Sequence, residues 1–281
     1  MFYLLNIFIQ MKILLNNDLL LNSLRPYNDV GFIPTMGGIH KGHLSLIDKS
    51  NQFCNKTIVS IFINPKQFNN IKDLKNYPKN LKKDLYILKK TKKVDFVYIP
   101  KFRDIYNNNR KSKITLLKKD KILCAKFRKK HFEGVLDVMN RLTKLINPKK
   151  IFMGKKDFQQ FYLVKKYLET KYKTEVIGCK TVRGKNKVAL STRNYLLKKS
   201  ELNIASKVSK KFLSLKNKLK KQKNYKKFLL TKKKEIEKNT KIKIEYMELR
   251  NINDLKISMK INNSRLFVAY YINQIRLIDN F

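Results

Sequence analysis

The sequence has few acidic residues, few glycines and prolines, and no tryptophan. Its 281 residues include 20 Asp and Glu, 8 Gly, 6 Pro and 0 Trp, against 65 Lys and Arg. Lysine, asparagine, isoleucine, tyrosine and phenylalanine are abundant instead, as expected when an AT-rich genome shifts surface positions. Hydrophobic residues still make up 43% of the chain, so it can bury a sizeable core in one or two domains.

The formal net charge of +45 would ordinarily indicate nucleic acid or an anionic membrane surface as a partner. However, the charge is carried by 55 Lys and only 10 Arg. Proteins that read nucleic acids rely on Arg for bidentate and stacking contacts. We therefore interpret the charge as compositional drift and expect no specific nucleic-acid partner. A basic nucleic-acid-binding protein stays open as the alternative from another functional class.

Cysteine is also scarce, and its three residues are scattered along the chain. Cys54, Cys124 and Cys179 form neither a C-x-x-C motif nor a paired framework. We expect all three to be reduced, buried residues of a cytoplasmic protein.

Long hydrophobic runs are missing as well. The apolar residues 1–15 are interrupted by Asn6, Gln10 and Lys12, with no basic segment in front and no small-residue cleavage site. This pattern predicts neither a signal peptide nor a membrane span, and we expect no membrane partner.

Segments typical of strands and helices alternate through the first part of the chain. The runs at 30–33, which Pro34 cuts off, and at 57–63 have the composition of parallel strands that are buried on both faces. Residues 12–24 fit a short strand and then a helix capped near Asn17 or Asp18. Further strands are expected at 94–99, 151–153 and 174–182, helices at 44–51, 81–88, 134–146 and 158–168, and a loop tip at 107–109. The alternation predicts an α/β fold with a Rossmann-like, doubly wound parallel sheet.

The pattern changes near residue 181. Residues 196–238 are rich in lysine with apolar residues at helical spacing, and 241–249, 265–272 and 275–278 have strand patterns. We therefore expect a first domain over residues 1–181 and a smaller α+β domain over residues 182–281.

Residues 30–47, VGFIPTMGGIHKGHLSLI, combine a strand, a glycine turn and a helix start. Two of the three histidines, His40 and His43, lie here in an H-x-G-H arrangement. Backbone N–H groups and the helix dipole attract phosphate at such a junction, and Gly37, Gly38 and Gly42 permit close approach. Two imidazoles could then stabilise charge that develops at phosphorus. The alternative is a turn whose histidines only cap the helix.

Three further segments offer polar groups for a small ligand or a nucleotide. NPKQF at 64–68 supplies neutral amides after a buried strand, although Asn-Pro is also common in plain turns. GKKDFQQ at 154–160 supplies Lys for phosphate and Asp for a helix cap or a metal-bound triphosphate. LSTRN at 190–194 is either a phosphate-binding set or a helix cap with a surface Arg. His131 precedes a helix and is equally compatible with a half-buried structural histidine.

Taken in this order and at this spacing, the segments resemble the pantothenate synthetase, or pantoate–β-alanine ligase, family over about residues 12–280. The resemblance is carried by IPTMGGIHKGH at 33–43, VSIFINPKQF at 59–68, DL at 73–74, YP at 77–78, HF at 131–132, GV at 134–135, GKKDFQQ at 154–160, STRN at 191–194 and RLIDN at 276–280.

The resemblance implies a two-step ligation. The pantoate carboxylate attacks the α-phosphate of Mg-ATP and pyrophosphate leaves. The amine of β-alanine then attacks the pantoyl-adenylate to give pantothenate and AMP. The resemblance also implies that Mg2+ arrives bound to ATP rather than in a protein cage. It further implies a homodimer of Rossmann-like domains with smaller C-terminal domains that act as lids.

The same resemblance assigns residues to roles. His40, His43, Lys156 and Arg193 are implied to be catalytic, with His43 the proton donor. Pantoate and β-alanine are implied to bind at Gln67, Gln160 and Asn64. The implied ATP-binding residues are Met36, Gly37, Gly38, Ile39, His40, Lys41, Gly42, His43, Gly154, Lys155, Lys156, Asp157, Val182, Leu190, Ser191, Thr192 and Arg193.

The chain departs from the family pattern at a few positions. Residues 128–132 read RKKHF where the family usually has RPGHF, and Cys124 stands where an acidic residue is usual, in a region that contributes to the dimer contact and the site wall. Asn69 and Lys187 stand at or near usual glycines, and Thr192 replaces a serine but keeps a hydroxyl. The retained phosphate and pantoate positions predict an active, drifted enzyme. The alternative among enzymes is another H-x-G-H nucleotidylyltransferase.

Overall fold

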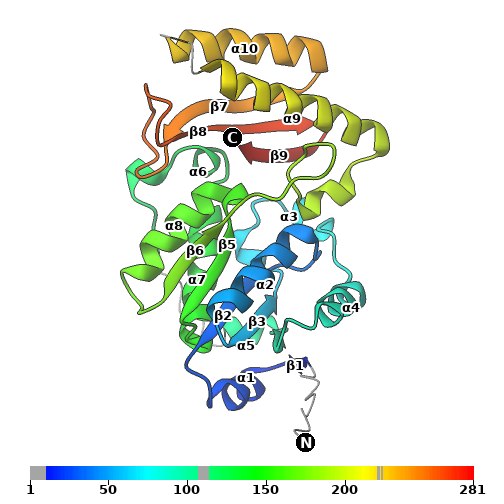
Figure 1. Cartoon of the computed structure of the whole chain (residues 1–281), viewed down its shortest axis with the longest axis vertical. Helices are drawn as coiled ribbons and strands as arrows, with labels where there is room; N and C mark the ends of the chain where they lie inside the picture. Colours follow the sequence, from blue (N-terminus) through cyan, green and yellow to red (C-terminus); the bar gives the residue numbers. More distant parts are fainter. Residues whose placement is uncertain (1–10, 107–113, 220–221, 223) are drawn as a thin grey trace, which may run out of the picture. The chain divides into compact units, whose positions relative to one another are not determined.

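A computed structural model describes residues 11–106, 114–219, 222 and 224–281 (Figure 1). The expectations for residues 1–10 and for the loop tip at 107–109 lie outside these residues. The chain divides into two compact units. Unit 1 comprises Met1–Thr115, Lys130–Met153 and Leu163–Cys179, and unit 2 comprises Leu116–Lys129, Gly154–Tyr162 and Lys180–Phe281. A domain boundary between residues 181 and 182 stays a prediction.

Unit 1 is built on a six-stranded sheet with the strand order β1-β4-β3-β2-β5-β6. Strand β1 pairs with β4, β4 with β3, β3 with β2, and β2 with β5, all in parallel. The strands are β1 Lys12–Leu14, β2 Val30–Thr35, β3 Lys56–Ile61, β4 Phe96–Tyr98, β5 Lys150–Gly154 and β6 Glu175–Cys179. The prediction of a doubly wound parallel sheet is confirmed.

Helices flank this sheet (Figure 1). They are α1 Asn17–Leu24, α2 Lys41–Phe53, α3 Ile71–Lys75, α4 Leu81–Thr91, α5 Phe102–Tyr106, α7 His131–Ile146 and α8 Phe158–Glu169. Helices α2, α4 and α7 bury apolar side chains. One buried cluster joins Ile33, Val59 and Val97 of the central strands to Ile47 of α2 and Leu88 of α4. This packing fixes where β2 ends and α2 begins, at the edge of the sheet where parallel strands place ligands.

Two local expectations in unit 1 are wrong. Strand β2 continues through Pro34 to Thr35 instead of ending before the proline. Its pairing with β5 covers only Gly31 and Phe32, so Pro34 lies where β2 has a neighbouring strand on one side, a position that tolerates a missing N–H. Helix α1 is capped by the Asn16 side chain, which accepts from the backbone nitrogen of Leu19, and not by Asn17 or Asp18.

Unit 2 contains the antiparallel sheet that the sequence predicts for the C-terminal part. Strands β7 Lys243–Asn251, β8 Ser264–Ile272 and β9 Ile275–Asn280 pair in the order β7-β8-β9. Helices α9 Lys199–Leu219 and α10 Tyr225–Thr240 pack on it around a core that includes Phe212, Leu266 and Val268. Shorter segments are η2 Lys118–Asp120, α6 Cys124–Phe127, η3 Lys155–Asp157 and η4 Thr192–Leu196. A further short segment, η1 Pro65–Gln67, belongs to unit 1.

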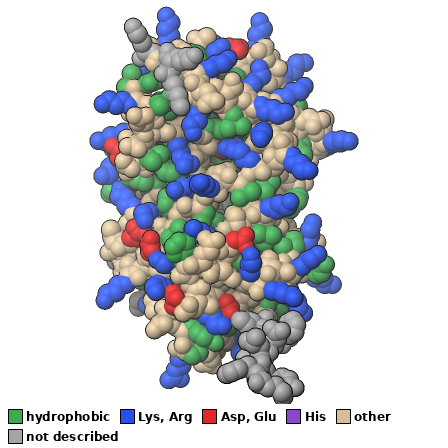
Figure 2. Space-filling model, in the orientation of Figure 1, with side chains coloured by type: hydrophobic (Ala, Val, Ile, Leu, Met, Phe, Trp, Pro, Cys, Tyr) green, Lys and Arg blue, Asp and Glu red, His purple; other side chains and the backbone are tan. Residues whose placement is uncertain are grey.

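On the face shown in Figure 2, the positive charge is spread out and not concentrated in one patch. Figure 2 shows Lys and Arg side chains scattered over the visible face among hydrophobic and neutral side chains. Within the described ranges, no helix is both long and apolar enough to cross a membrane. All three cysteines are free thiols, and Cys54 and Cys124 are buried. Cys179 is only partly buried, because β6 lies at the edge of the sheet.

Candidate active site

The H-x-G-H turn joins the end of β2 to the start of α2. Gly37 and Gly38 adopt the left-handed region, with φ of 79° and 64°. A Cβ at Gly37 would lie 2.9 Å from Asp84 Oδ2 and 3.4 Å from Ile61 Cγ2. Gly37 therefore satisfies both the positive φ and the close packing that this turn requires.

Asp84 of α4 holds the turn from outside the motif. Its carboxylate accepts the backbone N–H of Gly38 at 2.9 Å and that of Ile39 at 2.7 Å. The residue is 3% exposed, and a carboxylate that accepts two amide donors makes charge-assisted hydrogen bonds. The sequence analysis missed Asp84. Its only signal is a single acidic residue in the first turn of an otherwise lysine-rich helix.

These contacts change what the turn offers to a phosphate. The N–H of Gly37 donates to Thr35 Oγ1 at 3.2 Å, and those of Gly38 and Ile39 donate to Asp84. The backbone donors that the sequence indicated for phosphate are thus already engaged within the protein at these three residues. At these three residues, the backbone contributes to the shape of the turn.

His40 and His43 cap helix α2 reciprocally. His40 Nδ1 accepts from the backbone nitrogen of Gly42 at 3.0 Å, and His43 Nδ1 accepts from the backbone nitrogen of His40 at 3.3 Å. The two rings stack with centroids 4.1 Å apart. An Nδ1 that accepts a hydrogen bond carries no proton, so each neutral ring bears its proton on Nε2. The capping alternative is therefore correct in geometry, and it leaves both rings in the tautomer that can donate through Nε2.

The NPKQF segment places its amides beside the motif turn. Gln67 Nε2 donates to Met36 Sδ at 2.8 Å, and Asn64 Nδ2 donates to Gln67 Oε1 at 3.2 Å. Asn64 is 1% exposed and its Oδ1 accepts from the Tyr106 hydroxyl at 3.0 Å. Burial raises the pKa of Tyr106, so that hydroxyl keeps its proton at neutral pH. Gln67 is thereby held toward the turn by a chain of buried hydrogen bonds.

The third histidine supports the same segment from α7. His131 is buried, and its Nδ1 donates to the backbone oxygen of Gln67 at 2.6 Å. At Gly134, one turn further along α7, a Cβ would lie 2.2 Å from the backbone oxygen of Lys66. The start of α7 therefore packs directly on the backbone that carries Gln67, which explains the HF-x-GV pattern in this chain as a packing requirement.

The remaining predicted residues lie in unit 2. Gly154 ends β5, and Lys155, Lys156 and Asp157 form η3, in which Lys156 Nζ lies 3.4 Å from Asp157 Oδ1. Gln160 lies in the first turn of α8 and is partly buried.

The segment from Val182 to Arg193 forms a loop of unit 2 that is closed by its own backbone hydrogen bonds. Leu190 N donates to Val182 O at 2.9 Å, and Arg183 and Ala189 form an isolated antiparallel bridge. Ser191 caps η4 by accepting from the backbone nitrogen of Arg193 at 3.3 Å. The helix cap that the sequence offered as the alternative interpretation of residues 190–194 is therefore present. It sets the backbone direction at Arg193.

The structure thus gathers the predicted residues into two sets. Unit 1 brings together Met36, the H-x-G-H turn, Asn64 and Gln67. Unit 2 carries residues 154–157, Gln160 and the loop from 182 to 193. Besides Asp84, the sequence analysis missed Asp279 and Asn280 as polar contacts of the second set, although it quoted both within the RLIDN segment.

Cys124, the residue at a usual acidic position, is buried in unit 2. Its Sγ lies 3.1 Å from the Tyr246 hydroxyl and 3.4 Å from Arg276 Nη2. The Arg276 guanidinium is also paired with the Glu245 carboxylate. Glu245 thus supplies a carboxylate partner for Arg276 where Cys124 supplies none.

The parallel sheet with an H-x-G-H turn at a strand end defines a nucleotide-transferring enzyme of the H-x-G-H type. Residues 13–281 match the Pantoate-beta-alanine ligase family. The chain belongs to this family.

Relatives and solved structures agree with this assignment. The chain is 35% identical to the pantothenate synthetase of Flavobacterium psychrophilum, covering 92% of this chain and 93% of that protein. It is 38% identical to the enzyme of Leptospira interrogans, covering 89% of each. The pantothenate synthetase structure from Thermus thermophilus superposes with a TM-score of 0.90 at 27% identity, over 96% of this chain and 99% of that one. The pantoate-β-alanine ligase from Francisella tularensis, solved with Beta-gamma ATP and β-alanine, gives 0.80 at 33% identity, over 96% and 97%.

Proposed function

We propose that this chain uses ATP to join pantoate and β-alanine into pantothenate, through a pantoyl-adenylate, with release of pyrophosphate and AMP. Family membership supports the reaction. The observation that carries the chemistry is the reciprocal cap between His40 and His43, because it presets both rings as Nε2–H donors at the end of a central strand.

In the first step, the pantoate carboxylate attacks the α-phosphorus and charge builds on the phosphate oxygens. Donors that are oriented before the reaction stabilise such charge without reorganising. His40 and His43 are held in this way by backbone contacts to their Nδ1 atoms. We assign His43 as the residue whose Nε2–H donates a strong hydrogen bond to the leaving pyrophosphate, with His40 beside it.

We assign substrate binding to the side-chain amides of Gln67, Gln160 and Asn64. Gln67 and Gln160 bind pantoate, and Gln67 also lies near β-alanine. Asn64 is nearly fully buried and bonded to Tyr106 and Gln67, so its part in substrate binding is exerted through Gln67. A neutral carboxamide can donate to a carboxylate and bond to hydroxyls, and it adds no negative charge that would repel the substrate.

Nucleotide binding is assigned to both sets of residues. The ATP-binding residues that the resemblance implies are Met36 to His43, residues 154–157, Val182 and residues 190–193, with Lys156 and Arg193 assigned to the phosphates.

Magnesium enters this scheme as part of Mg-ATP. Across the described ranges, no group of three or more His, Cys, Asp or Glu suited to a metal is found. Asp157, whose side chain is 47% exposed, is the acidic side chain nearest the phosphate-binding lysines in sequence and would contribute an oxygen ligand. The bound metal would supply charge neutralisation on the phosphates.

We further propose that the enzyme works as a homodimer in the cytoplasm, as the resemblance implies. Sedimentation equilibrium of the full chain measures the mass of the assembly, and we expect that of a dimer. A monomer at micromolar concentration would contradict the proposed homodimer.

The test of the reaction is pantoate-dependent exchange of labelled pyrophosphate into ATP. We expect exchange only when pantoate is present, and formation of pantothenate with AMP when β-alanine is added. A folded protein without exchange would overturn the proposal. Exchange that needs no pantoate would favour another H-x-G-H nucleotidylyltransferase.

The nucleic-acid alternative is tested separately. Tight binding of DNA or RNA at 0.2 M salt would support it, whereas weak binding that disappears steeply with salt is expected from the net charge alone.

A further inference from the structure

Strand β9 ends in two adjacent polar residues, Asp279 and Asn280, which are 5% and 3% exposed. We propose that this pair are positioning residues that hold both ATP-binding segments of unit 2, the η3 turn and the loop from 182 to 193. The proposal rests on the nucleotide-binding role assigned to these segments above.

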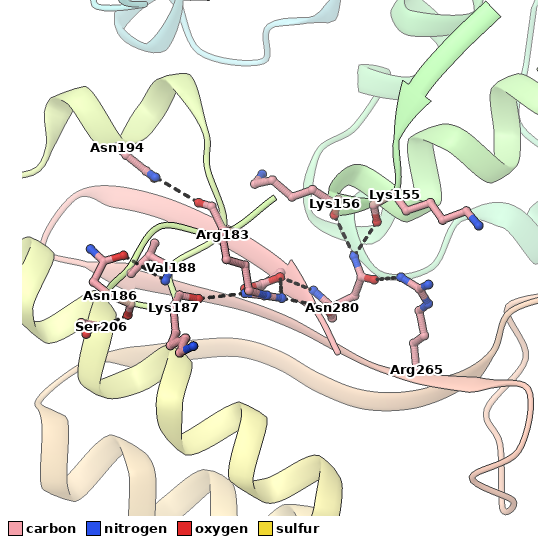
Figure 3. Close-up of polar contacts among 12 residues, drawn as sticks. Lys155, Lys156, Arg183, Asn186, Lys187, Val188, Asn194, Ser206, Arg265 and Asn280 are labelled. Carbon is pink, nitrogen blue, oxygen red and sulfur yellow. Dashed lines mark hydrogen bonds and ion pairs between the residues drawn. The ribbon is translucent and has the colours of Figure 1, made fainter. Parts of the chain in front are cut away.

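Asn280 holds the η3 turn by its side chain. Its Nδ2 donates to the backbone oxygens of Lys155 at 2.8 Å and Lys156 at 2.9 Å (Figure 3). Both carbonyls belong to the residues that carry the proposed phosphate-binding ammonium groups. Fixing two consecutive carbonyls fixes the peptide planes between them, and therefore the direction in which the Lys156 side chain leaves the backbone.

Arg265 fixes which way the Asn280 amide faces. Arg265 Nη1 donates to Asn280 Oδ1 at 2.6 Å, and its guanidinium carbon lies 5.0 Å from the centre of the Phe158 ring. The amide therefore has a cation on its oxygen and two carbonyls on its nitrogen, so only one of its two orientations satisfies all three partners. An aspartate at this position would keep the contact to Arg265 but would face the two carbonyls with a second oxygen.

Asp279 holds the other segment. Its carboxylate accepts two hydrogen bonds from Arg183, Nη1 to Oδ2 at 2.7 Å and Nη2 to Oδ1 at 2.8 Å. Arg183 also donates to the backbone oxygens of Lys187 at 3.1 Å and Asn280 at 3.2 Å. Burial raises the pKa of Asp279, while Arg183 and Lys156 oppose that rise. The bidentate pair ties the base of the 182–193 loop to the end of β9.

The pleat of the strand explains why two neighbours can reach two different segments. Successive side chains of a strand point to opposite faces, and Asp279 and Asn280 pair with Val268 and Phe267 of β8 as ordinary ladder positions. Asp279 can therefore reach Arg183 of the loop, while Asn280 reaches the η3 turn. Two consecutive residues, Asp279 and Asn280, therefore set the position of the η3 turn relative to the loop from 182 to 193.

The test compares Asn280→Asp and Asn280→Ala with the wild-type full chain. We expect Asn280→Asp to weaken ATP binding, measured by calorimetry, by about tenfold or more, and Asn280→Ala by less, because only the aspartate repels the two carbonyls. The KM for ATP should rise in parallel, while the KM for β-alanine stays within about twofold.

Asn273→Asp is the matched control. Asn273 lies in the turn between β8 and β9, and its Nδ2 donates to Glu201 Oε1, so the change likewise replaces an amide donor in unit 2 by an oxygen that faces an acceptor. It contacts neither ATP-binding segment and should leave ATP affinity unchanged. Arg183→Lys is a second probe, because it keeps the charge and loses the bidentate contact to Asp279.

The outcomes separate this inference from the proposed reaction. If folded Asn280→Asp binds ATP as tightly as the control while only its unfolding midpoint falls, Asn280 is a purely structural residue and the proposal is wrong. A wild-type chain that binds ATP without pantoate-dependent exchange overturns the proposed reaction and leaves the Asn280 comparison valid. A wild-type chain that does not bind ATP overturns both.

Discussion

Asp84 Oδ1 accepts the backbone N–H of Ile39 at 2.7 Å, across 45 positions of sequence. With the second bond to Gly38, this contact joins the first turn of α4 to the H-x-G-H turn. The conformation of the proposed catalytic turn therefore depends on a residue that has no place in the motif itself.

The first prediction concerns this contact. Asp84→Asn keeps the shape but presents an NH2 group to one of the two backbone donors, leaving a buried N–H without an acceptor. We expect a loss of about 1 to 3 kcal/mol in the free energy of unfolding, measured by urea denaturation, together with a lower kcat. Asp48→Asn is the control, because Asp48 is exposed and pairs with the exposed Lys93. An equal loss in both variants would contradict the role given to Asp84.

The second prediction separates capping from chemistry at the two histidines. His40→Ser retains an oxygen that can cap α2, so its unfolding free energy should stay within about 1 kcal/mol of wild type. Its pyrophosphate exchange should nonetheless fall by about a hundredfold, because the Nε2 donor is gone. His40→Ala should lose both. Full exchange activity in a folded His40→Ser variant would remove His40 from the catalytic set.

The third prediction concerns backbone strain at two lysines. Lys130 and Lys187 adopt φ of 62° and 68°, at or near positions where the family usually has glycine. Lys130→Gly and Lys187→Gly should each raise the free energy of unfolding by about 0.5 to 1 kcal/mol, because glycine adopts this region without the Cβ penalty.

Asn69 provides the comparison for these lysines. It also stands at a usual glycine, but among the described residues it is not one of those with a positive φ. Asn69→Gly should therefore bring no gain. A stabilisation at Asn69 equal to that at Lys130 would show that the effect does not come from the left-handed backbone.

The fourth prediction is a pH dependence at Cys54. Burial, with Asp29 adding to it, raises the pKa of the Cys54 thiol from 9.0 to about 11. Between these two values the unfolded chain has released a proton that the folded chain still holds, so stability falls as pH rises. Cys54→Ala should lose this part of the alkaline decline when unfolding is followed between pH 8 and 11.

Alkylation gives an independent check of the same thiol. At pH 8, iodoacetamide should modify the partly exposed Cys179 well before the buried Cys54. Peptide mapping by mass spectrometry identifies the modified residue, and equal rates at the two positions would show that Cys54 is not shielded.

Much of the fold could be predicted from local patterns. The buried runs of β2 and β3 and the apolar spacing of α7 stand out because burial on two faces, or on one helical stripe, constrains each residue type. The end of β2 was misplaced because proline is a weak breaker where a strand has only one neighbour at that point. The Asn16 cap was missed by one position because three consecutive residues there can all cap a helix.

The candidate site could likewise be predicted only in part. The histidines, Gln67, Lys156 and Arg193 could be selected from short motifs, since each motif keeps its chemistry within a few residues. By itself, then, the sequence determined the order of strands and helices and the chemical groups available to the reaction.

The tertiary structure alone decided which groups hold those residues in place. Asp84 reaches Gly38 across 46 positions and Asn280 reaches Lys155 across 125. Such pairs depend on the strand order β1-β4-β3-β2-β5-β6 in one unit and on the register of β9 against β8 in the other. Hydrophobic periodicity reports which face of an element is buried, and it contains no information about which distant element covers that face.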